Sequence, residues 1–222
     1  MNPKNRFKAV LFDLDGTLLD TLQDLADSLN AILEAHQMEI VGLDDYRNFV
    51  GKGLSELIKC VLPKDKISSE LIEEFLAAMK IEYAKRWSIN TKPYPGIPEL
   101  LDELQRNNIP ITVLSNKADN FTKIIVETLL PNWNFAIVKG LTDDFPAKPD
   151  PASALQIACD LKIQPQEFLY LGDTDIDMQT ANSAGMYAVG VLWGFRTAEE
   201  LKANGAKILI ESPLELMNLF KQ

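Results

Sequence analysis

Close to its amino terminus, the chain carries the segment Phe12-Asp13-Leu14-Asp15-Gly16-Thr17-Leu18, directly after an apolar run over residues 9–12. The apolar run predicts a buried strand, and the polar residues and glycine that follow predict a turn. Because residues i and i+2 of an extended segment point to the same side, we expect the carboxylates of Asp13 and Asp15 to lie side by side. Two such charges favour a bound divalent cation, for example Mg²⁺. An acidic turn that merely joins a strand to a helix would show the same pattern.

The composition indicates a globular protein with an acidic surface. Of the 222 residues, 46% are hydrophobic and 24% are charged, and the formal net charge is −10. This charge repels nucleic acids and acidic membranes, so we expect no nucleic acid and no membrane as partner. The sequence shows no apolar run of transmembrane length and no signal-peptide core, so we expect a cytoplasmic protein.

The cysteines and the single histidine argue against several kinds of site. Cys60 and Cys159 lie in apolar helical segments far apart in the sequence, so we expect buried thiols rather than a disulfide. His36 lies within a helical segment with no nucleophile motif nearby, which argues against a Ser-His-Asp triad and against histidine-rich zinc sites. We expect His36 to be an ordinary helix or cap residue.

The segment from residue 19 to residue 90 is predicted to be wholly helical. Apolar residues recur there at helical spacing, and nothing in it indicates a strand. The predicted helices are residues 20–35, 43–50, 54–62 and 68–87. Prolines and a glycine within residues 92–98 mark the end of this helical insert.

Beyond the insert, short apolar strands alternate with helices. The predicted strands are residues 109–114, 135–138, 168–171, 187–191 and 207–210. The helices between and beside them are residues 99–106, 121–130, 152–161, 178–184 and 198–204. This alternation predicts an α/β fold with a doubly wound parallel sheet, whose ligands bind beyond the carboxyl ends of the strands. We therefore assign residues 1–18 and 91–222 to the α/β core and residues 19–90 to the helical insert.

Polar side chains follow two of these strands. Ser115 and Asn116 come directly after the strand at 109–114, where their hydroxyl and amide groups could bind phosphoryl oxygens. Such residues are also ordinary helix caps. Lys148 stands in the proline-containing loop Ala147-Lys148-Pro149-Asp150-Pro151, which would hold its positive charge in place. A solvated surface lysine is the ordinary alternative.

Three carboxylates end the strand at 168–171, at Asp173, Asp175 and Asp177. If a helix begins near Thr174, Asp173 and Asp177 lie on one side, one turn apart, and Asp175 points elsewhere. Acidic residues favour helix amino termini in general. Three of them in this space would repel one another unless a cation is present.

Together, these four motifs resemble those of the haloacid dehalogenase superfamily of phosphotransferases, over nearly the whole chain. The superfamily pattern is Asp-x-Asp-Gly-Thr, then Ser or Thr, then Lys, then Gly-Asp-x-x-x-Asp, and this sequence matches each part. The resemblance implies a Rossmann-like core and makes residues 19–90 a helical cap domain. It further implies phosphoryl transfer, since the dehalogenases of this fold do not need the second aspartate, Asp15, or a magnesium site.

The resemblance also implies roles for individual residues. Asp13 would attack the substrate phosphorus to form an aspartyl-phosphate, and Asp15 would act as general acid and then as general base. Mg²⁺ would bind the Asp13 carboxylate, the Asp15 backbone carbonyl and Asp173, with Asp177 orienting this shell through water or Lys148.

The remaining site residues surround the phosphoryl group in this reading. Ser115 and Lys148 would hold its oxygens, while Asn116 and Gly16 would line the same pocket. No part of the four motifs departs from the superfamily pattern.

Residues 13–21, 50–53, 115–117 and 191–196 are similar to the corresponding segments of phosphoglycolate phosphatases. This resemblance implies 2-phosphoglycolate as the best single substrate. Lys52 lies in a Gly51-Lys52-Gly53 loop of the cap, where it could contact a small carboxylated leaving group. An ordinary turn between two cap helices is the alternative. Trp193 and Arg196 lie in the loop after residues 187–191, where either could contact a substrate. We expect a packed tryptophan and a surface arginine instead.

The leading prediction is thus an Mg²⁺-dependent phosphatase for a small phosphorylated metabolite, as a monomer or homodimer. A pyrophosphatase or nucleotidase would share the catalytic residues and differ in its cap contacts. A sugar-phosphate mutase of the β-phosphoglucomutase type would return the phosphoryl group to sugar. A non-catalytic binding protein would be expected to lack Asp13, Asp15 or Lys148, all of which are present.

Overall fold

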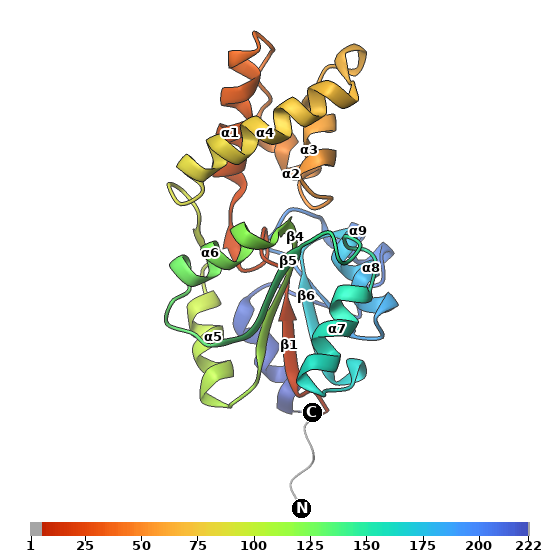
Figure 1. Cartoon of the computed structure of the whole chain (residues 1–222). Helices are drawn as coiled ribbons and strands as arrows, with labels where there is room; N and C mark the ends of the chain where they lie inside the picture. The colour runs from red at the N-terminus through yellow and green to blue at the C-terminus, as the bar shows by residue number, and fades with distance from the viewer. Residues whose placement is uncertain (1–5, 222) are drawn as a thin grey trace, which may run out of the picture. The chain divides into compact units, whose positions relative to one another are not determined.

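In the computed structural model, residues 6–221 are described, and a parallel sheet is the centre of the fold. Its strands are β1 (Ala9–Phe12), β4 (Ile111–Ala118), β5 (Phe135–Leu141), β6 (Phe168–Gly172), β7 (Tyr187–Val191) and β8 (Ile208–Ile210). Within the described residues, the sheet has six strands in the order β5-β4-β1-β6-β7-β8, and every neighbouring pair is parallel (Figure 1). The chain first builds outward from β1 to β5 and then crosses back to β6, so the predicted doubly wound α/β fold is confirmed.

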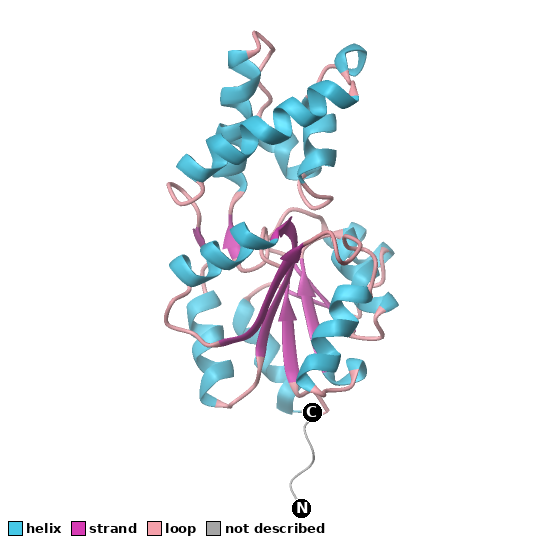
Figure 2. Cartoon of the chain, in the orientation of Figure 1, coloured by secondary structure: helices cyan, strands magenta, loops and turns pink. Residues whose placement is uncertain are grey.

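Helices flank the sheet on either side of the strands (Figure 2). They are α5 (Ile97–Arg106), α6 (Asp119–Leu129), α7 (Ala152–Leu161), α8 (Asp175–Ser183) and α9 (Ala198–Ala203), with the 3₁₀ segments η2 (Pro165–Glu167) and η3 (Pro213–Lys221). Helices α7, α8 and α9 share one buried core with alternate residues of β1 and β6, for example Leu11 and Tyr170. Alternation of side chains along each strand explains why one face of β1 packs against these helices.

The segment between β1 and β4 contains a helical unit. Its helices are α1 (Leu22–Ala35), α2 (Leu43–Phe49), α3 (Leu54–Val61) and α4 (Ser69–Arg86), with the 3₁₀ turn η1 (Lys64–Lys66). Helix α4 starts after Ser68, whose hydroxyl accepts a hydrogen bond from the Leu71 amide. The apolar stripe of α1 is buried, as the helical spacing predicts, and the buried side chains of α4 are Phe75, Met79 and Tyr83.

The chain divides into two compact units. One unit comprises the described parts of Met1–Leu19 and Pro93–Gln222, and the other is Asp20–Lys92. At the junctions, the two-residue strands β2 (Leu19–Asp20) and β3 (Lys92–Pro93) pair with each other. The assignment of these units to a catalytic core and a cap stays a proposal. Within residues 6–221, no helix combines the length and apolarity that a bilayer crossing requires.

Some predictions about local structure were wrong. Residues 19–20 form a strand, because their backbone pairs with a segment about seventy residues away, which local spacing does not reveal. Strand β4 continues through Ala118, and the long 3₁₀ segment η3 was not predicted.

The prediction of buried thiols was also wrong. Cys60 and Cys159 are both free and exposed. On α3 the buried residues are Leu57, Ile58 and Val61, so helical periodicity turns Cys60 to the opposite, solvent-facing side. His36 is the C-cap residue of α1, and its prediction as an ordinary helix or cap residue is confirmed.

Candidate active site

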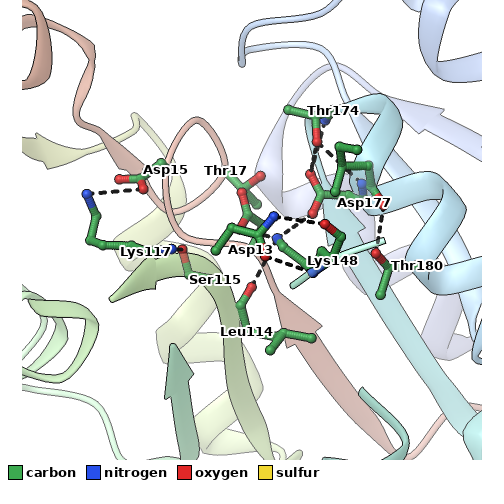
Figure 3. Close-up of polar contacts among 12 residues, drawn as sticks. Asp13, Asp15, Thr17, Leu114, Ser115, Lys117, Lys148, Thr174, Asp177 and Thr180 are labelled. Atoms are coloured by element: carbon green, nitrogen blue, oxygen red, sulfur yellow. Dashed lines mark hydrogen bonds and ion pairs between the residues drawn. The ribbon is translucent and has the colours of Figure 1, made fainter. Parts of the chain in front are cut away.

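The carboxyl ends of the central strands bring the four sequence motifs together. Strand β1 lies between β4 and β6 in the sheet, and Asp13 directly follows β1, while Asp173 directly follows β6. Ser115 belongs to the last part of β4, and Lys148 precedes helix α7. Figure 3 shows Asp13, Lys148 and Asp177 gathered in one place, with Ser115 nearby. The parallel topology therefore delivers these side chains to one edge of the sheet.

Lys148 is a buried lysine that joins two aspartates. Its Nζ atom lies 2.6 Å from Oδ1 of Asp13 and 2.7 Å from Oδ1 of Asp177, and it also donates to the Leu114 carbonyl at 3.2 Å (Figure 3). Burial disfavours its charged form, but the attraction of Asp13 and Asp177 outweighs burial and raises the pKa of Lys148 well above the ordinary value. The geometry therefore supports the prediction that Lys148 is a rigidly held cation and not a solvated surface lysine.

Asp13, Asp173 and Asp177 form a buried acidic cluster. One carboxylate oxygen of each lies within 4.8 Å of the others. Burial and the charge of Asp177 raise the pKa of Asp13 well above its ordinary value, although Lys148 opposes this shift. Burial, and next the charge of Asp177, also raise the pKa of Asp173 to about 7. Three acids thus share a buried site in which Lys148 offsets only part of their charge.

This donor set fits a hard divalent cation. Carboxylate oxygens are the ligands that Mg²⁺ and Ca²⁺ prefer, and the raised pKa values of Asp13 and Asp173 show that their ionised forms need more positive charge nearby. The cluster could therefore hold a metal ion. Asp13 and Asp173 are the candidate ligands, because Asp177 accepts more hydrogen bonds from the protein than either of them, from Lys148, Tyr170 and Thr174.

The start of α8 holds Asp177 in place. Thr174 donates to Oδ2 of Asp177 from its hydroxyl at 2.6 Å and from its amide at 3.1 Å, and the Asp177 amide donates to the Thr174 hydroxyl. This is a capping box, which satisfies the first amides of the helix. Tyr170 and Lys148 both donate to the other oxygen, Oδ1. As predicted, Asp175 points elsewhere: it is partly exposed, whereas Asp177 is buried.

Asp173 is held by two loops. The Thr17 hydroxyl donates to its Oδ1 at 3.1 Å, and the Phe195 amide donates to its Oδ2 at 2.8 Å. Gly16, at φ 87°, lies so close that a Cβ atom there would be 2.3 Å from Asp173 Oδ2. Glycine at position 16 is therefore required both by the backbone conformation and by the approach of Asp173.

Asp15 points away from Asp13, so the prediction of adjacent carboxylates was wrong. Strand β1 ends at Phe12, and the residues after it form a tight turn in which Gly16 has a positive φ. Because the backbone is not extended there, side chains two residues apart do not share a side. The Asp15 carboxylate turns to Lys117 instead, with Oδ2 3.2 Å from Nζ (Figure 3).

A β-bulge places the polar residues at the end of β4. Leu114 pairs with Lys139 of β5, and the next paired residue, Ala118, faces Leu141. Three residues of β4 thus face a single residue of β5, which re-aims their side chains as bulges near active sites commonly do.

Asn116, in the bulge, binds the backbone of Lys148. Its Oδ1 accepts a hydrogen bond from the Lys148 amide at 2.8 Å, and its Nδ2 donates to the Lys148 carbonyl at 3.1 Å. The amide of Asn116 thus positions Lys148, and direct contact between Asn116 and a substrate stays a prediction. Ser115 is buried, and its hydroxyl accepts a hydrogen bond from the Lys117 amide at 3.2 Å.

Sequence reasoning missed four residues of the site: Thr17, Lys117, Tyr170 and Thr174. Thr17 and Thr174 lie inside quoted motifs, and their position beside the acids was a usable signal. Tyr170 looked like an ordinary strand residue, and the turn from β6 into α8 brings Asp177 to its hydroxyl.

The predictions for Trp193 and Arg196, in the loop after β7, have different outcomes. Trp193 is partly buried and donates from Nε1 to the Thr17 carbonyl at 2.9 Å, so the prediction of a packed tryptophan holds. Arg196 is not a surface arginine: its side chain is only 7% exposed, and its Nε lies 3.9 Å from Asp175 Oδ1. The predicted exposure was wrong because this loop folds back onto the β1 turn, which local sequence does not show.

Lys52 lies in the other unit, Asp20–Lys92, between α2 and α3. It is exposed, and the glycines on both sides have positive φ values of 124° at Gly51 and 88° at Gly53. A turn between two helices is confirmed, and a role for Lys52 in substrate binding stays a prediction.

The family model of haloacid dehalogenase-like hydrolases matches residues 10–191. A phosphoglycolate phosphatase from Aquifex aeolicus (strain VF5) is 33% identical over 188 residues, which cover 85% of this chain and 86% of that protein. A second one, from Nitrosospira multiformis, is 30% identical and covers 97% and 96% of the two chains. An N-acetylmuramic acid 6-phosphate phosphatase from Pseudomonas aeruginosa is also 30% identical, over 96% and 95%.

Solved structures agree with the fold. A crystal structure from Lactobacillus delbrueckii subsp. bulgaricus superposes with a TM-score of 0.88 at 28% identity, covering 96% of this chain and 98% of that one. A haloacid dehalogenase-like family hydrolase from Streptococcus pneumoniae has a TM-score of 0.87 at 21% identity, over 97% and 99%. The match spans both the sheet and the helical unit. The chain therefore belongs to the haloacid dehalogenase-like hydrolases, and it is an enzyme similar to the phosphoglycolate phosphatases.

Proposed function

We propose that this protein is an Mg²⁺-dependent phosphatase that hydrolyses a small phosphorylated metabolite, with 2-phosphoglycolate as the first candidate. One observation carries the proposal: the buried Lys148 Nζ bonds Asp13 and Asp177 within a cluster of three acids at the carboxyl ends of the central strands. A nucleophilic carboxylate, a fixed cation and a metal-binding acid set are the parts that phosphoryl transfer requires.

Asp13 is the proposed nucleophile. Its carboxylate oxygen attacks the substrate phosphorus, a new O–P bond forms, and the ester P–O bond breaks with its electron pair left on the departing oxygen. Asp15 donates a proton to that oxygen and so releases an alcohol. In the second half, Asp15 takes a proton from water, and the water oxygen forms a new O–P bond. The Asp13 O–P bond breaks with its electron pair left on the Asp13 carboxylate, and inorganic phosphate leaves.

The other residues bind and orient. Lys148 and Ser115 hold the phosphoryl oxygens, and Asn116 keeps the Lys148 loop in place through its two hydrogen bonds. Thr17 and the Phe195 amide fix the Asp173 carboxylate.

Mg²⁺ is the proposed cofactor, and it would be bound by Asp13, Asp173 and the backbone carbonyl of Asp15. When bound, it supplies positive charge that stabilises the phosphoryl group during transfer. Other residues of the protein would orient these ligands. Asp177, which is held by Thr174, bonds Lys148, and Lys148 in turn bonds Asp13.

The substrate class rests on relatives of this chain. Two of them are named phosphoglycolate phosphatases, at 33% and 30% identity. Lys52, exposed between two glycines, could read a carboxylate on the leaving group. The relative named N-acetylmuramic acid 6-phosphate phosphatase, also at 30% identity, favours a phosphorylated sugar acid as the second candidate.

A phosphate-release screen with Mg²⁺ tests the function. It compares 2-phosphoglycolate, N-acetylmuramic acid 6-phosphate, β-glucose 1-phosphate, pyrophosphate, nucleoside monophosphates and p-nitrophenyl phosphate, with EDTA as control. We expect metal-dependent release, fastest from 2-phosphoglycolate. Preference for pyrophosphate or nucleotides would favour the pyrophosphatase or nucleotidase alternative. Glucose 6-phosphate formed from β-glucose 1-phosphate would favour the mutase, and no release from any ester would overturn the proposal. The monomer or homodimer state and the cytoplasmic location stay predictions.

A further inference from the structure

Lys117 differs from the lysines that form ion pairs on the surface. Its side chain is 8% exposed, whereas the paired lysines Lys59, Lys85 and Lys123 are 42%, 59% and 52% exposed. Lysine is rarely buried without a specific partner. Here the partner is Asp15, whose side chain is 14% exposed and whose Oδ2 lies 3.2 Å from the Lys117 Nζ.

The backbone on both sides of this pair is fixed. Lys117 follows the bulge at the end of β4, and its amide donates to the Ser115 hydroxyl. Asp15 pairs with Leu19 in an isolated parallel bridge, and the Gly16 amide donates to the Leu19 carbonyl at 2.9 Å. The ion pair therefore joins two segments whose backbones are ordered, which keeps the two charged groups within reach of each other.

The two oxygens of Asp15 have different surroundings. Oδ2 faces Lys117, whereas Oδ1 is buried and accepts no hydrogen bond from any residue in the range 6–221. Native proteins seldom leave a buried carboxylate oxygen without a donor, and such atoms are commonly satisfied by a substrate or by water in an active site. Thr17 and Ser115, on the same two segments, lie at the reaction centre (Figure 3).

We propose that Lys117 is a positioning residue for Asp15: by holding Oδ2, it directs Oδ1 to the leaving-group oxygen of a phosphate ester. This inference rests on the proposed phosphatase function and adds a residue to it. Lys117 does not touch the reacting phosphorus in this scheme. It acts through Asp15, which donates a proton to the departing oxygen as the ester P–O bond breaks. Its loss therefore harms esters whose leaving group needs that proton.

The test is the rate of leaving-group release in a single turnover, with 2-phosphoglycolate and with p-nitrophenyl phosphate. The alkoxide of glycolate needs a proton, whereas p-nitrophenolate leaves readily without one. For Lys117→Met, we expect release from 2-phosphoglycolate to slow by about 10- to 100-fold, and release from p-nitrophenyl phosphate to stay within about threefold. Lys123→Met, which removes an exposed paired lysine, is the charge-matched control and should leave both rates unchanged.

Two further variants separate positioning from a merely structural role. Lys117→Arg keeps a cation and should recover most of the rate with 2-phosphoglycolate. The double variant Asp15→Asn/Lys117→Met should be no slower than Asp15→Asn alone, because Lys117 acts only through Asp15. An equal loss with both esters, or additive losses in the double variant, would overturn the inference while leaving the phosphatase function intact. If the wild-type protein releases phosphate from no ester with Mg²⁺, the proposed function itself fails and this inference fails with it.

Discussion

Asp24, in the helical unit, and Asp173, at the edge of the sheet, are both buried, at 1% and 0% exposed. The carboxylate of Asp24 is surrounded by neutral donors. It accepts hydrogen bonds of 2.7–3.0 Å from the amides and side chains of Asn90 and Thr91. These bonds tie the start of α1 to the segment by which the chain leaves the helical unit.

Asp173 has a different environment. It shares its site with Asp13 and Asp177, and its pKa is raised to about 7 by burial and by the charge of Asp177. The comparison shows that burial alone does not mark a functional acid. A buried acid supplied with neutral donors stabilises the fold, whereas a buried acid among like charges needs a cation and is therefore a candidate for chemistry.

Asp13→Asn should produce the largest change. We expect the rate of Mg²⁺-dependent phosphate release to fall by at least about 10³-fold, because the amide is not a nucleophile. Stability to urea should stay equal or rise, since one charge leaves the crowded cluster. The exposed Asp144→Asn is the matched control. Near-normal turnover by Asp13→Asn would exclude the proposed nucleophile.

The pH dependence of stability should distinguish the cluster from ordinary acids. Between the ordinary pKa of 3.8 and the folded value of about 7, folded Asp173 keeps a proton that the unfolded chain has lost. Stability in EDTA should therefore fall as pH rises from about 4 to about 7, by about 1.4 kcal/mol per pH unit from this group. Mg²⁺ should oppose the fall, because it binds the ionised acids of the folded state.

Urea unfolding at several pH values checks this expectation. Asp173→Asn serves as the reference, since the difference between it and the wild type isolates the contribution of Asp173. Identical slopes for the two proteins in EDTA would show that Asp173 is not the group responsible.

Asp24→Ala should reduce stability and spare the chemistry. Removal of the carboxylate leaves the buried amide of Thr91 and its hydroxyl without their acceptor, so we expect a loss of about 2–4 kcal/mol. Asp27→Ala removes another carboxylate from the same helix. That carboxylate is more exposed and accepts a hydrogen bond from the Gln23 side chain, so we expect a much smaller loss of stability. Urea unfolding and phosphate release below the transition measure both effects. A folded Asp24→Ala protein with normal stability would show that Asp24 does not stabilise the fold.

Asn116→Ala should give the smallest effect. The variant loses both hydrogen bonds to the Lys148 backbone. We therefore expect a loss of about 1–2 kcal/mol of stability and a decrease of about tenfold in kcat/KM. Asn107→Ala, which removes a single bond to the Glu103 carbonyl at an exposed position, is the control. An equal effect of the two substitutions would mean that Asn116 does not position Lys148.

Most of the fold was predictable from the sequence because local patterns determine it. The runs at 9–12 and 168–171 are apolar throughout, as central strands of a parallel sheet are, and β1 is buried along its whole length. Helical spacing placed the buried stripe of α1 correctly. The two-residue strands β2 and β3 escaped prediction, since their pairing joins residues far apart in the chain.

The part of the candidate site that lies within the four sequence motifs was predictable. The types and the order of Asp13, Ser115, Lys148 and Asp173 indicate phosphoryl chemistry, and the rule that parallel strands end at one edge places these residues together. That much the sequence by itself determined.

The tertiary structure alone decided which side chains meet. It turned Asp15 toward Lys117, since the chain bends after Phe12. It also folded the loop at 193–196 onto the β1 turn, where the Phe195 amide holds Asp173. These contacts depend on backbone direction and on distances between segments remote in sequence, and neither is contained in the spacing of residue types along one segment.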